Sequence, residues 1–177
     1  MTEIVDTARR YAISCHSATH HSYDGRPYEY HLSSVFEIAR RFIHLIPEGE
    51  QDNILAGCWV HDVCEDCRET YNNIKAATSE RVAELAYALT NEKGKTRAER
   101  ANDKYYAGIK ETPGATFIKV CDRIANYEYS KYCTKAGKGK NKMEEKYRME
   151  MPGFIEKLHD PQYQEMFDYL LKITESK

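Results

Sequence analysis

The sequence lacks any long hydrophobic run, and this absence sets the first limit on what the protein can be. No apolar stretch approaches the roughly 20 residues that a membrane-spanning helix needs. The first residues carry acidic side chains early and contain no long apolar segment, so we expect no signal peptide and no membrane partner. The sequence therefore predicts a protein of the cytoplasm.

An excess of positive charge is also missing. Lysine and arginine together number 26 and the acidic residues 28, so the formal net charge is −2. Domains that bind nucleic acid usually show a basic face, and the composition argues against such a partner. The six cysteines mostly lie inside helical patterns, which favours reduced thiols over a secreted disulfide framework.

Strict alternation of apolar and polar residues is not sustained anywhere long enough to predict a β-strand. Apolar residues instead recur at helical spacing, with no internal repeat and no shift of composition that would mark a second domain. We therefore expect one all-α domain over residues 1–177, a bundle of about eight to ten helices, with residues 20–28 as a loop. The expected helices span residues 2–18, 31–44, 51–64, 70–77, 79–90, 97–111, 116–132, 142–151 and 162–174.

A cluster of charged residues follows the most hydrophobic segment directly, where "NILAGCWV" runs into "HDVCED". With about 100° per residue on a helical wheel, its ionisable side chains continue the arc of Trp59 and point inward. An unpaired buried carboxylate costs several kcal/mol, and a divalent cation with imidazole and carboxylate ligands would neutralise the cluster. The alternative is an ordinary solvated helix end. The cluster consists of His61, Asp62, Glu65 and Asp66.

Two further residues are candidate metal ligands. Asp122 lies four residues after Ile118 on an apolar stripe, and Asn126 lies four residues further on the same face. A salt bridge to Lys119 is the alternative explanation for Asp122. His31 opens a helix directly after a proline-containing loop, where a lone histidine is more often a cap or a surface residue.

The order His31, His61–Asp62, Asp122 is the H…HD…D order of the HD phosphohydrolase superfamily. Across about residues 8–130, four blocks resemble the PYxxHxxxV, LLHDxxED, VxxLVxxLT and KLxDRxxN blocks of Rel/SpoT-type hydrolases. The size resembles the stand-alone small alarmone hydrolases of the metazoan SpoT homologue type, with the C-terminal helices of residues 140–175 following the motifs. The matching blocks are "RPYEYHLSSV", "WVHDVCED", "VAELAYALT" and "IKVCDRIAN".

This resemblance implies an HD-domain helical bundle around one metal site that holds manganese. Carried over residue by residue, it implies that the metal ligands are His31, His61, Asp62 and Asp122 and that the pair acting on the attacking water is Glu65 and Asp66. Asn126 matches a substrate-contacting asparagine, and Arg148 corresponds to a phosphate-binding arginine.

One departure from the family concerns the segment before the PY block. The family typically carries GQxR there, whereas this chain has "ATHHSYDGRPY" and lacks the arginine that contacts the nucleotide. The candidates to replace it are His20, His21, Tyr23 and Arg26. Lys93 or Lys95 in "NEKGK" is a further candidate to bind the polyphosphate.

The resemblance implies an enzyme that removes the 3′-pyrophosphate from ppGpp or pppGpp, the alarmones of the stringent response. A small-molecule nucleotide is then the partner, and a homo-oligomer is left open. Two alternatives stay open as well. The first is an HD phosphohydrolase that acts on another nucleotide or on a phosphorylated dinucleotide, which the altered loop before Pro27 would allow. A non-catalytic nucleotide sensor is less favoured, because it would not need the Glu65–Asp66 pair.

Overall fold

The structure, a computed structural model, describes residues 1–135 and 142–175 and is all-α apart from one short hairpin, which confirms the expected fold class. The α-helices are α1 (Glu3–Ala18), α2 (Glu29–Phe42), α3 (Gln51–Val60), α4 (Val63–Asp66), α5 (Tyr71–Ala77), α6 (Glu80–Leu89), α7 (Arg97–Arg100), α8 (Asp103–Glu111), α9 (Ala115–Lys135), α10 (Lys142–Leu158) and α11 (Gln164–Glu175). The hairpin strands are β1 (Ser22–Tyr23) and β2 (Arg26–Pro27), and the 3-10 helices are η1 (Ile43–Leu45), η2 (Glu48–Glu50) and η3 (Pro161–Tyr163).

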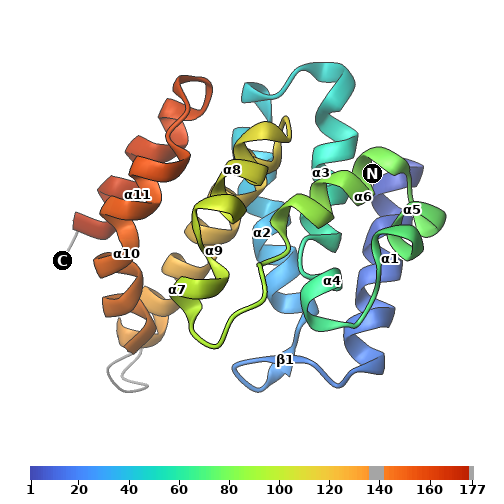
Figure 1. The fold of residues 1–177 in the computed structure, drawn as a ribbon, viewed down its shortest axis with the longest axis horizontal. Helices are drawn as coiled ribbons and strands as arrows, with labels where there is room; N and C mark the ends of the chain where they lie inside the picture. Colours follow the sequence, from blue (N-terminus) through green and yellow to red (C-terminus); the bar gives the residue numbers. More distant parts are fainter. Residues whose placement is uncertain (136–141, 176–177) are drawn as a thin grey trace.

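Helices α2, α3 and α9 form the centre of the bundle, and the other helices pack on either side of them. Helices α1 and α2 both pack against α3, while α9 packs against α2 on one side and α10 and α11 on the other. Figure 1 shows α1 and α5 at one end of the molecule and α10 and α11 at the opposite end. Within the described ranges, no helix combines the length and hydrophobicity that crossing a bilayer requires.

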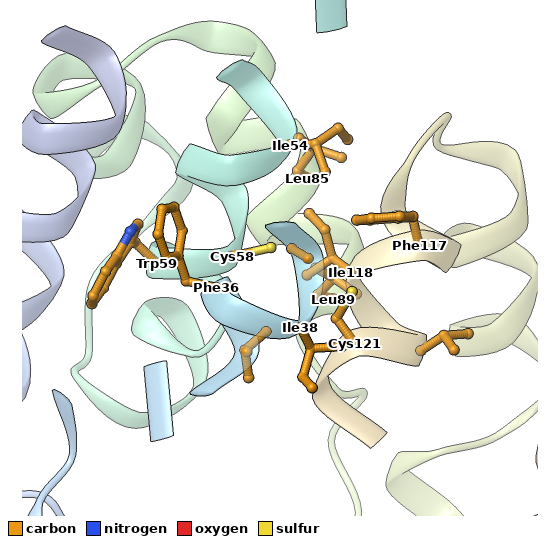
Figure 2. Packing of buried hydrophobic residues seen from close by; sticks show 14 of the residues in the cluster. Phe36, Ile38, Ile54, Cys58, Trp59, Leu85, Leu89, Phe117, Ile118 and Cys121 are labelled. Atoms are coloured by element: carbon orange, nitrogen blue, oxygen red, sulfur yellow. The ribbon is translucent and has the colours of Figure 1, made fainter. Parts of the chain in front are cut away.

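Helix α3 lies at the centre of the hydrophobic core. Figure 2 shows Trp59 of α3 beside Phe36 of α2, with Cys58 turned toward Ile118 of α9. Gly57 lets the helices approach, because an added Cβ would lie 2.7 Å from Ile118 Cδ1. This close approach brings the carboxyl end of α3, with its histidine and aspartate, toward the middle of α9.

The segment expected to be an irregular loop contains the short hairpin instead. Ser22 pairs with Pro27 and Tyr23 with Arg26, so the connection is the dipeptide Asp24–Gly25. Both loop residues have positive φ, 50° and 77°, as a type I′ turn requires, and Asp-Gly is a preferred dipeptide for that turn. The sequence reading took the pair only as a break in regularity.

Three expected helices have different bounds in the structure. The helix expected over 51–64 stops at Val60, because the backbone at Asp62 (φ −101°, ψ −2°) leaves the regular helix before α4 begins. The helix expected over 97–111 divides into α7 and α8, and the side chain of Asn102 caps the second piece. The helix expected to end at residue 151 continues through Pro152 to Leu158. The sequence also predicts a basic loop at "KAGKGKNK", residues 135–142, and its residues 136–141 lie outside the described ones.

Candidate metal centre and active site

Four side chains from α2, the end of α3 and α9 converge in one cluster. His61 Nε2 lies 3.0 Å from Asp62 Oδ2 and 4.0 Å from Asp122 Oδ1. His31 Nε2 lies 3.3 Å from Asp122 Oδ1 and 3.6 Å from Asp62 Oδ2. Ligand atoms bound at about 2.1 Å to one ion are about 3.0–4.2 Å apart in tetrahedral or octahedral arrangements. These four separations are compatible with a single cation, and ligand atoms of His31, His61 and Asp122 lie within 4.8 Å of one another.

The ring of His61 is oriented for metal binding. Its Nδ1–H donates to the carbonyl oxygen of Cys58 at 2.9 Å, which leaves the lone pair on Nε2. The Nε2 atom is buried and has no hydrogen-bond partner within the described part of the chain. An orphaned buried acceptor that faces two carboxylates is costly, and a cation between them would remove that cost. The donor set of this structure therefore fits a divalent metal ion.

The electrostatics of the cluster agree with this interpretation. Burial would raise the pKa of Asp62, but His61 and His31 hold it well below its ordinary value. Burial would likewise raise the pKa of Asp122, but Lys119 and His31 lower it. Burial disfavours the charged form of His31, yet hydrogen bonds to the two aspartates raise its pKa to about 9. The two ionised carboxylates thus demand compensating positive charge, which a divalent cation supplies while both imidazoles stay neutral.

Neutral hydrogen-bond donors hold the two carboxylates in place. Tyr28 Oη donates to Asp62 Oδ2 at 2.5 Å, and Asn126 Nδ2 donates to Asp122 Oδ1 at 2.5 Å. The amide oxygen of Asn126 in turn accepts from Tyr23 Oη at 2.8 Å. The hydroxyl of Tyr28 is a contact that the sequence reading missed, although the residue stands in the "RPYEYH" block that carries the family resemblance.

Lys119 forms the salt bridge that was the alternative explanation for Asp122. Its Nζ lies 3.1 Å from Asp122 Oδ2. The other oxygen of the carboxylate, Oδ1, is the one that faces His31. The salt bridge and the cluster therefore coexist, one on each oxygen.

Glu65 and Asp66 line the same cavity as the cluster. Both carboxylate oxygens of Glu65 accept from Asn91 Nδ2, at 2.8 and 2.9 Å. Burial, together with the negative charges of Asp62 and Glu65, raises the pKa of Asp66 to about 7. A carboxyl group with such a pKa exchanges a proton readily near neutral pH.

The cavity has a volume of about 700 Å³, within the usual range for a site that binds a small molecule. Helices α2, α3 and α9 supply the metal cluster, and α7 and α10 supply most of the basic side chains. Glu150 binds two of these, Arg97 at 2.9 Å and Arg123 at 2.9 Å. The basic residues that line the cavity are Arg97, Arg100, Lys119, Arg123, Lys146 and Lys157.

The predicted substrate contacts divide into two groups. Asn126 lines the cavity, whereas Arg26, Lys95 and Arg148 are not among its lining residues. Arg26 stands over the ring of Tyr30 beside a separate groove, and Lys95 is exposed. Arg148 pairs with the glutamate four residues before it and is 57% exposed. Their contact with substrate stays a prediction.

The sequence analysis missed the basic residues of α7 and α10 that line the cavity. Arg97 and Arg100 lie one turn apart behind the N-cap Thr96, and that spacing was visible in "TRAER". Lys146 and Lys157 occupy one face of α10 together with Glu150. Their proximity to the metal cluster depends on the packing of α10 and α8 beside α9, which no local pattern reveals.

No protein-family model matches the chain. Two curated proteins named guanosine-3′,5′-bis(diphosphate) 3′-pyrophosphohydrolase MESH1 are similar to it. The mouse protein is 26% identical over 123 residues, 69% of this chain and 66% of its own length. The zebrafish protein is 23% identical over 144 residues, 80% of this chain and 77% of its own length. The matched segment thus spans slightly less than two thirds of the mouse relative.

A solved structure has a similar fold. It is described as a metazoan ortholog of SpoT that hydrolyses ppGpp and plays a role in starvation responses. The TM-score is 0.71, with 16% sequence identity over 97% of this chain and 96% of that one. The likeness supports the resemblance drawn from the sequence motifs, and the chain has the all-α fold of this SpoT ortholog.

Proposed function

We propose that the protein is a metal-dependent phosphohydrolase that removes the 3′-pyrophosphate from ppGpp or pppGpp. The observation that carries the proposal is the convergence of His31, His61, Asp62 and Asp122 beside a cavity large enough for a nucleotide. The activity named for the mouse and zebrafish relatives supports this choice of substrate.

The four clustered residues would hold the metal ion, which we propose to be Mn²⁺. When bound, such an ion supplies Lewis-acid chemistry, which makes water more acidic and polarises a phosphoryl group. Tyr28 and Asn126 orient the ligand carboxylates through their hydrogen bonds. Asn126 is therefore a positioning residue here, and its amide also lies at the cavity where substrate would bind.

Glu65 and Asp66 carry the proton transfers in this mechanism. Glu65, held by Asn91, orients the attacking water and accepts its proton as the water attacks the phosphorus bonded to the 3′-oxygen. The bond between that phosphorus and the 3′-oxygen breaks. Asp66, with a pKa of about 7, donates a proton to the departing 3′-oxygen, so that GDP or GTP and pyrophosphate are the products.

The basic side chains of α7 and α10 bind the phosphates. Arg97 and Lys157 already form ion pairs with Glu150 and Asp103. Arg100 and Lys146 have no ion-pair partner among residues 1–135 and 142–175, so they are the cations available to a phosphate. Charge-assisted hydrogen bonds from these residues would hold the nucleotide with its 3′-pyrophosphate at the metal cluster.

A pair of variants tests the assignment of the ligands and of the water-activating residue. Asp122→Ala should lose both the metal ion of this cluster and pyrophosphate release from ppGpp, because it removes a ligand oxygen. Glu65→Ala should keep the metal and lose turnover. The control is Glu37→Ala, an exposed glutamate on α2 that pairs with Arg40 on its own helix. Turnover retained by the Asp122 variant would contradict the ligand assignment.

A substrate panel tests the substrate itself. Pyrophosphate released from ppGpp with Mn²⁺ would support the proposal. Orthophosphate released from nucleoside monophosphates, nucleoside triphosphates or a phosphorylated dinucleotide, with ppGpp left intact, would replace it with another HD phosphohydrolase activity. Tight binding of ppGpp without turnover would identify a nucleotide sensor and refute the enzyme.

We further propose that the chain acts as a single domain in the cytoplasm. The supporting observation is that the six cysteines are all free, as expected for a protein kept in a reducing compartment.

A further inference from the structure

A second group of potential ligand atoms lies outside the metal cluster described above. His16 Nδ1 faces His21 Nδ1 at 3.1 Å, and His21 Nδ1 lies 3.5 Å from Asp66 Oδ2. Each of the three residues offers a ligand atom that lies within 4.8 Å of those of the other two. Ligand atoms held at about 2.1 Å by one ion lie about 3.0–3.4 Å from their nearest neighbours, so the separation of 3.1 Å matches a shared cation and that of 3.5 Å lies just above this range.

The backbone at the end of α1 brings the two histidines together. The carbonyl oxygen of His16 accepts from the N–H of His21 at 3.0 Å, and that of Ser17 accepts from the N–H of His20 at 3.1 Å. His20 has a φ of 52°, so this is a Schellman motif with a non-glycine residue in the left-handed position. Apolar side chains usually meet at these two positions of the motif, whereas here two imidazoles meet.

The environment of His16 favours a metal over a simple hydrogen bond. Its side chain is buried, with 2% exposed, and its Nδ1 atom faces the imidazole of His21. Two facing Nδ1 atoms can share one proton at most, although each can offer a lone pair to a cation. A neutral imidazole is the form that binds metals, and burial of His16 disfavours its charged form.

Tyr28 fixes the orientation of both imidazoles. Its ring stacks on His16 at 4.3 Å and on His21 at 4.0 Å between centroids. The hydroxyl of the same side chain donates to Asp62, a proposed ligand of the first metal. One tyrosine therefore stands between the two groups of ligands.

We propose that His16, His21 and Asp66 form a second binding site for a divalent transition-metal ion, next to the first. Two imidazoles and one carboxylate leave a coordination position open, and zinc is the ion that this donor set suits best. The site itself does not rest on the proposed function. An effect of a bound ion on turnover would rest on it, because Asp66 also lines the cavity beside the first cluster.

The number of zinc ions bound per chain tests this site. Zn²⁺ would be titrated calorimetrically into metal-stripped protein, and bound zinc would be counted by elemental analysis after dialysis. We expect two ions per chain in the wild type and one in His21→Ala. The control His20→Ala removes the neighbouring imidazole, which is exposed and belongs to neither site, and should keep two.

Asp122→Ala separates this inference from the assignment of the first site. It should also bind one ion, and the double variant with His21→Ala should bind none. A wild type that binds one ion, or a His21 variant that still binds two, would overturn the second site. Because metal content is measured without substrate, a failure of ppGpp hydrolysis would leave these counts unchanged. Circular dichroism of each variant shows whether the helices are intact.

Discussion

Gly114 offers a sharp test of how α9 is positioned. It precedes α9 with a φ of 81°, a backbone conformation that side chains disfavour. A Cβ added to this glycine would lie 2.2 Å from Ile54 Cδ1 and 3.8 Å from Leu85 Cδ2. The substitution Gly114→Ala therefore combines backbone strain with a clash against α3. Asp122 follows eight residues later, so the displaced segment is the one that carries a proposed metal ligand.

The expected loss of stability follows from these two costs. A side chain in the left-handed region costs about 1–2 kcal/mol, and overpacking a core costs about 1–3 kcal/mol. The reduced freedom of the unfolded chain returns about 0.4–1 kcal/mol. Gly114→Ala should therefore lower the free energy of unfolding by about 1–4 kcal/mol, a large share of the roughly 5–15 kcal/mol typical of a domain.

Alanine variants of two other glycines distinguish the cost of backbone strain at Gly114 from the cost of its side-chain clash with Ile54. Gly25 also has a positive φ, 77°, but nothing lies within 4 Å of its Cβ position, so its alanine variant should lose about 0–1.5 kcal/mol. Gly108 lies within α8 with an equally open Cβ position and no positive φ, and its alanine variant should gain about 0.5–1 kcal/mol. Urea denaturation of the three metal-free variants, followed by circular dichroism, gives the comparison. If Gly114→Ala were as stable as Gly25→Ala, the packing argument for α9 would be wrong.

Three further predictions concern the two groups of ligands. Asn126→Ala should weaken metal binding about 10–100-fold, because Asn126 holds the Asp122 carboxylate; unchanged affinity in calorimetry would show that the amide does not position it. His20→Gly should raise the free energy of unfolding by about 1 kcal/mol in urea, because glycine removes the left-handed strain, and a loss of stability would contradict this reading of the turn. In metal-free protein, His16 binds a proton in the unfolded state below its ordinary pKa of 6.5 but in the folded state only near pH 4. As the pH falls from 6.5 to 4, the free energy of unfolding of the wild type should therefore decrease by up to about 3 kcal/mol, and His16→Phe should lack this part of the decrease. Equal slopes of stability against pH in the two proteins would refute this assignment.

The inward direction of the charged cluster was predictable from helical periodicity, although the assumed helix was wrong in one detail. A continuous helix over 51–64 would place His61 and Asp62 on the arc of Trp59. The structure ends α3 at Val60, yet His61 still faces Asp122 of α9 and Asp62 still faces His31 of α2. The apolar face of α3 must be buried in either case, and the first residues after it follow that face inward.

The basic wall of the cavity could not be read from the sequence in the same way. On α10, Lys146 and Arg148 are two residues apart and so point about 200° away from each other around the helix. One basic residue of the two can therefore line the cavity, and the choice depends on which face packs against α9. Met151 and Phe154 are buried, and the cavity face beside them carries Lys146 and Lys157. Choosing the correct face requires knowing that α10 packs against α9, and the local sequence pattern of α10 does not show which helix it packs against.

Helical periodicity could not predict that the side chains of His16 and His21 face each other. Residues five apart on a regular helix point about 140° away from each other, so the two rings would diverge if α1 continued. They meet because the chain reverses at His20, in a conformation that costs an ordinary residue about 1–2 kcal/mol. Strained backbone of this kind persists where the surrounding contacts fix it, and here these contacts are the two Schellman hydrogen bonds and the ring of Tyr28. The strained residue, His20, therefore lies in the turn that brings the second group of ligands together. A strained backbone conformation that places two imidazoles face to face is a physical reason to test for a metal ion at this turn.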